Sequence, residues 1–184
     1  MRHSLSPEVT KAVVAAAVVG CALLVLPARA QAQEPGAGLG QGFGAQGQVA
    51  ITGDATAHFD KVNKAGWFFE VRPAADYFVV PSVTIGAVVG FGIDNNKNKG
   101  ILVGGRAGYN LNVTANVGAW ARVGIRYNHV SQTGGSFHET DVTVDLPILY
   151  HFVPHFFAGL APYYNLNVSG PDSYGFSSLV GGWF

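Results

Sequence analysis

The sequence predicts an all-β protein: an eight-stranded, antiparallel, up-and-down barrel that crosses a membrane after a signal peptide is removed. Three observations predict this fold class. The chain begins with a short apolar segment of the export type. From residue 47 onward, apolar side chains alternate with polar or small ones over eight segments. Longer polar connections alternate with tight turns, as they do at the two ends of a transmembrane barrel.

The N-terminal segment has the features of a cleaved signal peptide. Basic residues precede an uninterrupted apolar run over residues 12–26. This run is about 15 residues long, whereas a membrane-spanning helix needs roughly 20. Small residues around Ala30 then provide cleavage sites. We therefore expect residues 1–30 to be removed. The alternatives are an anchor that stays attached and lipidation of Cys21, which ends a lipobox-like sequence.

The remaining chain is slightly acidic and contains no cysteine. Removing residues 1–30 takes away three basic residues and one acidic residue, which leaves 8 basic and 10 acidic side chains and a net charge of −2. No basic patch for nucleic acid remains, and disulfide bonds are excluded. Residues 31–46 are rich in Gly and Gln and predict a flexible lead-in. Residues 47–184 then form one barrel domain.

The predicted strands have the length of transmembrane strands. They are residues 48–59, 67–77, 79–91, 101–111, 117–128, 140–152, 156–166 and 175–184. Most contain about 10 to 13 residues, close to the roughly 9–11 that a tilted strand needs to cross a bilayer. The longer connections are residues 60–65, 94–100, 129–139 and 167–174, and the tight turns lie around Phe78, at 112–116 and at 153–155. This alternation gives the barrel two different ends.

The two faces of the predicted strands differ in bulk and charge. In the second strand, for example, Phe69 and Val71 alternate with Glu70 and Arg72. An eight-stranded barrel has an interior just wide enough for side chains to fill, so bulky residues from every strand would overfill it. The apolar face must therefore contact lipid, while the glycines and charges point inward. An aromatic girdle is expected near the strand ends, from Trp67, Tyr77, Tyr109, Tyr127, Tyr150, Phe152 and Phe184.

The charges on the inward face predict an ion-pair network that fills the lumen. Its members are Asp54, Glu70, Arg72, Asp76, Arg106, Arg122, Arg126, Asp141 and Asp145. The planar guanidinium of arginine suits bidentate pairing with carboxylates in a confined space. Because the fifth and sixth strands are neighbours, we expect Arg122 or Arg126 to meet Asp141 or Asp145. The alternative is unpaired charges around a water-filled pore.

The C-terminal strand carries a resemblance to a known family. It ends with Trp183, expected to point inward, and Phe184, expected to face lipid. With residues 76–86 and 146–162, this ending resembles the small outer-membrane β-barrel domain proteins of Gram-negative bacteria, similar to the outer membrane protein A and W types. The resemblance implies an outer-membrane location and contact with membrane lipid and lipopolysaccharide. It also implies recognition of Trp183 and Phe184 by the barrel-assembly machinery. It supplies no catalytic motif and no cofactor.

Three functions remain open at this stage. The first is a structural or interaction barrel whose lumen is plugged. The second is a narrow passive channel for small solutes, including apolar ones that leave sideways through the wall, as in the outer membrane protein W type. The third, remote alternative is an enzyme, because His129 and Ser131 resemble the His-x-Ser element of lipid A deacylase barrels. Gln132 replaces the Asn that follows in that family, so no enzyme is predicted.

The histidines predict no metal site. His151 and His155 are four residues apart but lie across a strand and a turn rather than on a helix face. The others lie near predicted connections or, in one case, in the signal peptide.

Overall fold

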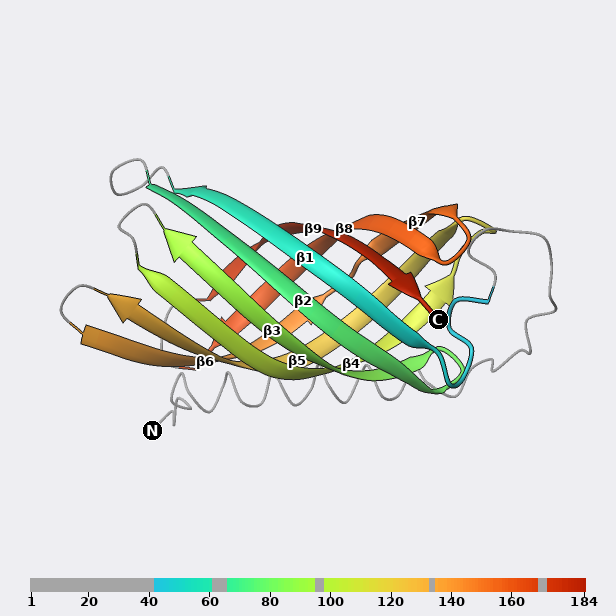
Figure 1. Ribbon diagram of the computed structural model, residues 1–184, viewed down its shortest axis with the longest axis horizontal. Helices are drawn as coiled ribbons and strands as arrows, with labels where there is room; N and C mark the ends of the chain where they lie inside the picture. The colour runs from blue at the N-terminus through green and yellow to red at the C-terminus, as the bar shows by residue number, and fades with distance from the viewer. Residues whose placement is uncertain (1–41, 61–65, 95–97, 133–134, 169–171) are drawn as a thin grey trace, which may run out of the picture.

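The protein folds as a closed β-barrel (Figure 1). The computed structural model describes residues 42–60, 66–94, 98–132, 135–168 and 172–184. The signal peptide, residues 31–41 of the lead-in, and residues 61–65 and 95–97 of two predicted connections lie outside the described residues. The strands are β1 (Val49–Asp60), β2 (Gly66–Val80), β3 (Val83–Asp94), β4 (Lys99–Asn112), β5 (Val117–Gln132), β6 (Gly135–Asp145), β7 (Ile148–Val153), β8 (Phe156–Asn167) and β9 (Ser173–Trp183).

Strands β6 and β7 are two parts of one transmembrane strand. Arg122 of β5 pairs with Asp145 of β6, and Ala119 pairs with Ile148 of β7 in the same register. Between them, the Trp120 N–H still donates to the Pro147 carbonyl at 2.8 Å. Proline has no N–H to return the bond, so the ladder is interrupted there. The barrel therefore has eight strands, as the sequence predicts.

The first and last strands close the barrel. Strand β1 pairs antiparallel with β9, and Ala50 lies opposite Trp183. Val49 and Phe184 exchange two backbone hydrogen bonds of 3.0 Å each at the chain end. Near the C-terminus, the described part of this ladder therefore has no open sheet edge. An open edge in hydrocarbon would leave backbone N–H and C=O groups without hydrogen-bond partners.

Two predicted connections are wrong in position. The turn expected around Phe78 lies at residues 81–82, because β2 continues to Val80 and Phe78 points into the lumen. The loop expected at residues 129–139 is mostly strand, since β5 continues to Gln132 and β6 begins at Gly135. Polar side chains on both faces at this end hide the strand period that the sequence pattern relies on.

Two of the tight turns are built alike. Each contains a proline, Pro81 or Pro154, followed by a residue at positive φ, with Ser82 at 67° and His155 at 69°. In both hairpins the pairing register shifts beside the turn. These turns lie at the same end of the barrel as Phe184, at the right of Figure 1.

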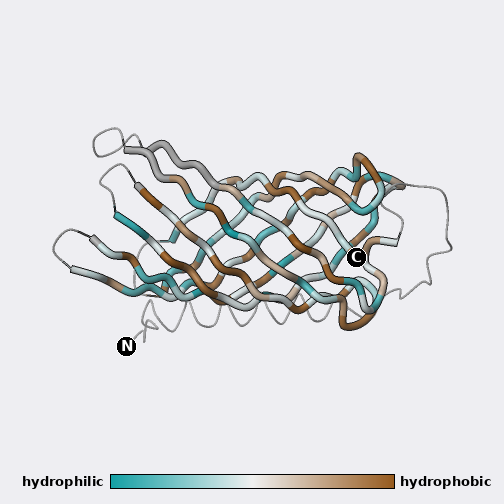
Figure 2. Tube along the Cα trace, in the orientation of Figure 1, coloured by the Kyte–Doolittle hydropathy of each residue, from teal (hydrophilic) through white to brown (hydrophobic). Residues whose placement is uncertain are grey.

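The outer face of the barrel is apolar. Large hydrophobic side chains recur at the outward-facing positions of the strands, among them Ile85, Phe91, Ile125, Leu160 and Val180, each between 54% and 62% exposed. Figure 2 shows hydrophobic residues interspersed with hydrophilic ones along the strands. Soluble monomers rarely expose so large an apolar surface, and lipid is the solvent that accommodates it. The predicted assignment of faces is therefore correct. No helix in the described ranges is long and apolar enough to cross a membrane.

Candidate functional site: the barrel lumen

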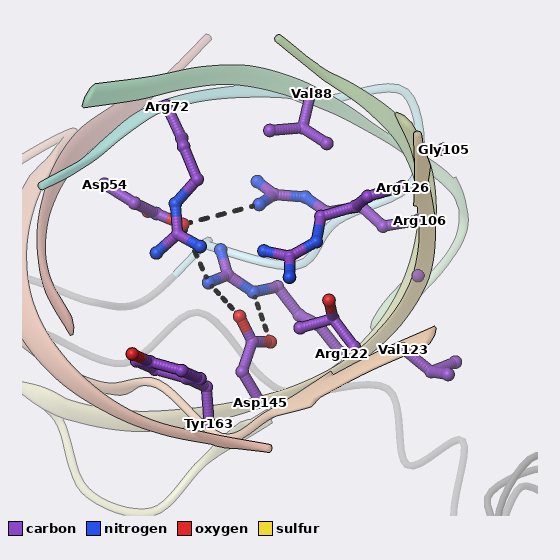
Figure 3. A pocket seen from close by; sticks show the side chains of 12 residues that line it. Asp54, Arg72, Val88, Gly105, Arg106, Arg122, Val123, Arg126, Asp145 and Tyr163 are labelled. Atoms are coloured by element: carbon purple, nitrogen blue, oxygen red, sulfur yellow. Dashed lines mark hydrogen bonds and ion pairs between the residues drawn. The ribbon is translucent and has the colours of Figure 1, made fainter. Parts of the chain in front are cut away.

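Four arginines occupy the middle of the lumen (Figure 3). Arg72 comes from β2, Arg106 from β4, and Arg122 and Arg126 from β5. On the neighbouring strands, glycines stand opposite three of them: Gly86 and Gly124 opposite Arg106, Gly108 opposite Arg122, and Gly104 opposite Arg126. A Cβ atom at Gly104 would lie 3.0 Å from Arg126 Cγ. The glycines of the inward face therefore leave the space that the guanidinium groups fill.

Two of these arginines form forked ion pairs. Arg106 Nε donates to Asp76 Oδ1 at 2.9 Å, and its Nη2 donates to Asp76 Oδ2 at 2.5 Å. Arg122 Nε donates to Asp145 Oδ1 at 2.9 Å, and its Nη2 donates to Asp145 Oδ2 at 2.7 Å. Such bidentate pairs are stronger and more directional than single contacts. The pair of Arg122 and Asp145 joins the neighbouring strands that the sequence predicts.

Asp54 links the two forks. Its Oδ2 lies 3.3 Å from Arg122 Nη2 and 3.7 Å from Arg106 Nη1. Because Asp54 lies on β1, the network reaches across the lumen and connects β1, β2, β4, β5 and β6. Figure 3 shows the contacts to Asp54 and Asp145 meeting in the centre of the barrel.

The remaining charges form a second group, which lies nearer the end of the barrel opposite the tight turns. Arg126 Nη2 lies 3.4 Å from Asp141 Oδ2, which also accepts a 2.5 Å hydrogen bond from Asn128. Arg72 lies 3.6 Å from Glu70 and over the ring of Tyr163. All nine residues of the predicted network thus lie in the lumen, and each takes part in at least one ion pair.

A small cavity remains between the arginines. It measures about 30 Å³ and is lined by Asp54, Arg72, Arg122, Arg126 and Tyr163, among others. Buried polar atoms without a partner face this region of the lumen: Asp54 Oδ1, Arg122 Nη1, Arg126 Nε and Thr143 Oγ1. A polar cavity of this size has room for one or two water molecules, which would satisfy them.

Below the polar network, the tight-turn end of the lumen is filled by aromatic rings. Phe43 is 2% exposed and lies at the centre of this cluster. Its ring centroid is 5.1–5.6 Å from those of five surrounding rings, which belong to Phe78, Trp120, His151, Phe157 and Trp183. The guanidinium groups of Arg106 and Arg122 lie over the Trp120 ring at 5.8 and 5.2 Å. The aromatic layer and the ion-pair layer are therefore in contact.

The segment that carries Phe43 is held by hydrogen bonds to the barrel. The Asn112 amide donates to the Phe43 carbonyl at 3.1 Å, and the Ser82 N–H donates to the Gly44 carbonyl at 2.7 Å. Gln48 Oε1 accepts from the N–H groups of Gly44 and Ala45. Gly44 also adopts a φ of 102°, which other residues rarely do. The expected flexible lead-in of residues 31–46 is therefore wrong for residues 42–46.

Sequence analysis missed Phe43 because its neighbours are Gly- and Gln-rich and show no period. The one available signal is that Phe43 is the sole aromatic residue of the segment 31–46. The structure explains why a large apolar side chain interrupts that composition.

The two C-terminal residues lie on opposite faces. Trp183 is 2% exposed inside the aromatic cluster, whereas Phe184 is 73% exposed on the outer face. Both orientations match the sequence prediction.

The His-x-Ser element does not form a nucleophile–base pair. His129 Nδ1 contacts His138 Nδ1 across the β5–β6 hairpin at 3.1 Å. Ser131 instead lies opposite Ser136 and Lys99 on the neighbouring strands. Nucleophilic catalysis requires the base within hydrogen-bond reach of the hydroxyl, and the described residues show no such contact. They also contain no cluster of three or more His, Cys, Asp or Glu residues suited to a metal ion.

The comparison with known proteins identifies the class of fold. No family model and no curated protein matches the chain. Among solved structures, the N-terminal barrel domain of Pseudomonas aeruginosa OprF is similar, with 17% identity, a TM-score of 0.61, and coverage of 76% of this chain and 98% of that domain. Neisserial surface protein A matches with 16% identity and a TM-score of 0.50, covering 76% of this chain and 96% of that one.

The Yersinia pestis outer membrane protein Ail, determined in a bilayer nanodisc, is 12% identical with a TM-score of 0.50 over 76% of this chain and all of that one. At these identities the likeness is one of fold. By fold, the chain is an integral outer-membrane β-barrel, as the sequence predicts. In barrels of this fold the short turns are periplasmic and the longer loops lie outside, so we expect the tight-turn end of this barrel to be its periplasmic end.

Proposed function

We propose that the protein is a non-conducting outer-membrane barrel with a structural or interaction role, and that its lumen is sealed by two layers in series. The observation that carries this proposal is Phe43, which fills the periplasmic end of the lumen and is 2% exposed. Above it, the forked pairs of Arg122 with Asp145 and Arg106 with Asp76 cross the centre.

The physics of burial supports this closed state. A charge in a low-dielectric interior must be paired, because an unpaired one is strongly destabilising. The side chain of Arg122 is 1% exposed, and that of Asp76 is fully buried. A continuous column of water through the lumen would instead leave these groups hydrated and exposed. The cavity of about 30 Å³ among the arginines has room for one or two water molecules, which is too little for such a column.

Single-channel recording on the purified full-length barrel in planar bilayers tests the proposal. We expect no stable conductance steps under an applied potential. Large, long-lived steps from protein whose folding is verified by its heat-dependent mobility in detergent gels would overturn it.

A narrow passage for apolar solutes is the second candidate, and one observation favours it. The described ladder between β1 and β9 spans six residue pairs, from Ala50 with Trp183 to Ala55 with Ser178, although β1 pairs with β2 over its whole length. The outer half of this seam therefore has fewer backbone hydrogen bonds than its neighbours. The test is uptake of an apolar dye into liposomes that contain the barrel. Uptake would support this candidate only if an engineered disulfide between β1 and β9 abolished the uptake.

The partners that we propose are those of the outer surface. The apolar belt would contact membrane lipid, and its outer rim would contact lipopolysaccharide. The barrel-assembly machinery would recognise the strand that ends in Trp183 and Phe184.

A further inference from the structure

The β5–β6 hairpin brings two histidines together on its outer face. His129 and His138 are directly opposite residues of the ladder. Their ring centroids are 4.7 Å apart, and their Nδ1 atoms are 3.1 Å apart. The Tyr127 hydroxyl also lies 2.6 Å from His138 Nδ1. Two polar groups, the Tyr127 hydroxyl and His129 Nδ1, therefore converge on the Nδ1 atom of His138.

The Tyr127 hydroxyl and His129 Nδ1 cannot both form a full hydrogen bond with His138 Nδ1. A ring nitrogen of a neutral imidazole either donates one hydrogen bond or accepts one. His138 Nδ1 has two partners within range, so one of the two contacts lacks a full hydrogen bond. A metal ion placed between the rings would instead use the lone pairs of both Nδ1 atoms.

The separation of the two nitrogens fits chelation of one ion. Two metal–nitrogen bonds of about 2.05 Å that span 3.1 Å would enclose an angle of about 98°. This value lies between the right angle of square-planar coordination and the tetrahedral angle. Imidazole is a favoured ligand of divalent zinc, copper and nickel, and copper binds most tightly in this series.

We propose that His129 and His138 form a binding site for a divalent first-row transition metal ion on the outer surface of the barrel, with copper(II) as its tightest ligand. This site is independent of the lumen and of the function proposed above. Its remaining coordination positions would be filled by water, because Ile101 lies opposite His129 on the β4 side.

The position of the pair makes it accessible to ions. Among the described residues, pairing between β6 and β8 extends from Asp145 with Tyr163 to Asp141 with Asn167, and one further hydrogen bond joins Val168 to Thr140. His138 lies nearer the hairpin tip than this described pairing, and its side chain is exposed. Figure 1 shows the β5–β6 hairpin extending past the neighbouring strands at the end opposite the C-terminus.

The test is copper(II) titration of the folded full-length barrel in detergent micelles, prepared without a histidine tag. Calorimetry should show one copper(II) ion bound per chain, and electron paramagnetic resonance should show nitrogen ligands. We expect His129→Asn and His138→Asn each to weaken binding by at least about tenfold, because the loss of a group that merely orients a ligand already has an effect of that size.

His155→Asn is the matched control. It removes an exposed histidine at the opposite end of the barrel, and asparagine tolerates the positive φ at this position. Copper(II) should also raise the unfolding temperature of the wild-type barrel but not of the His129→Asn/His138→Asn variant, since a ligand stabilises only the state that binds it. Equal binding by the wild type and the double variant, or equal loss in His155→Asn, would overturn the proposal.

Discussion

The rings of Phe43 and Trp183 lie with their centroids 5.1 Å apart inside the barrel. One residue precedes the first strand and the other ends the last strand, so this contact joins the two ends of the domain. It also completes the aromatic layer that fills the periplasmic end of the lumen. Trp183 therefore has a packing role in the closed lumen in addition to its place in the C-terminal strand.

Because the two layers lie in series along the lumen, we predict that removing either layer alone does not open a conducting path. Phe43→Ala should open the periplasmic end but leave the ion pairs, and joint replacement of Arg122 and Asp145 by alanine should open the centre but leave the rings. We expect stable conductance only when the two changes are combined, measured by single-channel recording. Phe91→Ala, which removes the same side chain from the outer face, is the control. Conductance in Phe43→Ala alone, equal to that of the combined variant, would contradict the series arrangement.

Phe43→Ala should also destabilise the barrel. Truncation of a buried phenylalanine removes apolar contacts and leaves a cavity, which costs about 3–5 kcal/mol. The expected change is a lower midpoint of urea unfolding in lipid vesicles, followed by tryptophan fluorescence from Trp120 and Trp183, which adjoin the ring. An unchanged midpoint would mean that the segment of residues 42–48 is not docked in the membrane-embedded protein.

The pair of Arg122 and Asp145 should show strong coupling. Arg122→Ala leaves the Asp145 carboxylate without its guanidinium partner and leaves Asp54 with the longer contact to Arg106 alone, and breaking a buried pair in this way costs about 3–5 kcal/mol. Replacing both Arg122 and Asp145 by alanine should be less destabilising than the sum of the Arg122→Ala and Asp145→Ala changes. The free energies of unfolding of the four proteins form the double-mutant cycle. Additive effects would show that the fork contributes nothing beyond its separate residues.

Substitution of Gly104 tests whether the inward-facing glycines leave the space that the arginine side chains occupy. A Cβ atom there would lie 2.6 Å from the Ile125 carbonyl oxygen and 3.0 Å from Arg126 Cγ. Gly104→Ala should therefore lower the free energy of unfolding by about 1–3 kcal/mol through overpacking. Gly53→Ala is the matched control, because nothing lies within 4 Å of its Cβ position, and it should be neutral or slightly stabilising. Equal effects at the two glycines would contradict the packing argument.

The alternation of side chains predicted most of the fold because lipid on one side and a filled lumen on the other impose opposite chemistry on the two faces. The same alternation identified Arg122 and Asp145 as inward-facing residues on adjacent strands. It failed where one of these constraints ends. Residues 129–139 extend beyond the apolar belt, so their strands have no apolar period, and the pairing of His129 with His138 was hidden. Phe43 lies outside any strand, and its burial depends on a tertiary contact that no local pattern encodes.

Substitution and deletion of Phe184 should distinguish its role in barrel assembly from its role in stability. Its side chain is 73% exposed on the outer face, while its backbone exchanges two hydrogen bonds with Val49. Phe184→Ala keeps these backbone bonds and removes the aromatic ring, whereas deletion of Phe184 removes both. If the ring is the assembly signal, Phe184→Ala should slow the appearance of folded barrel in outer membranes, scored by its heat-dependent gel mobility, without changing the free energy of unfolding of the assembled protein. Deletion should reduce both quantities.

Phe176→Ala, on the same face of the same strand and also 73% exposed, controls for loss of lipid contact. Assembly of Phe184→Ala at the rate of Phe176→Ala would assign Phe184 an ordinary place in the lipid belt and no signalling role.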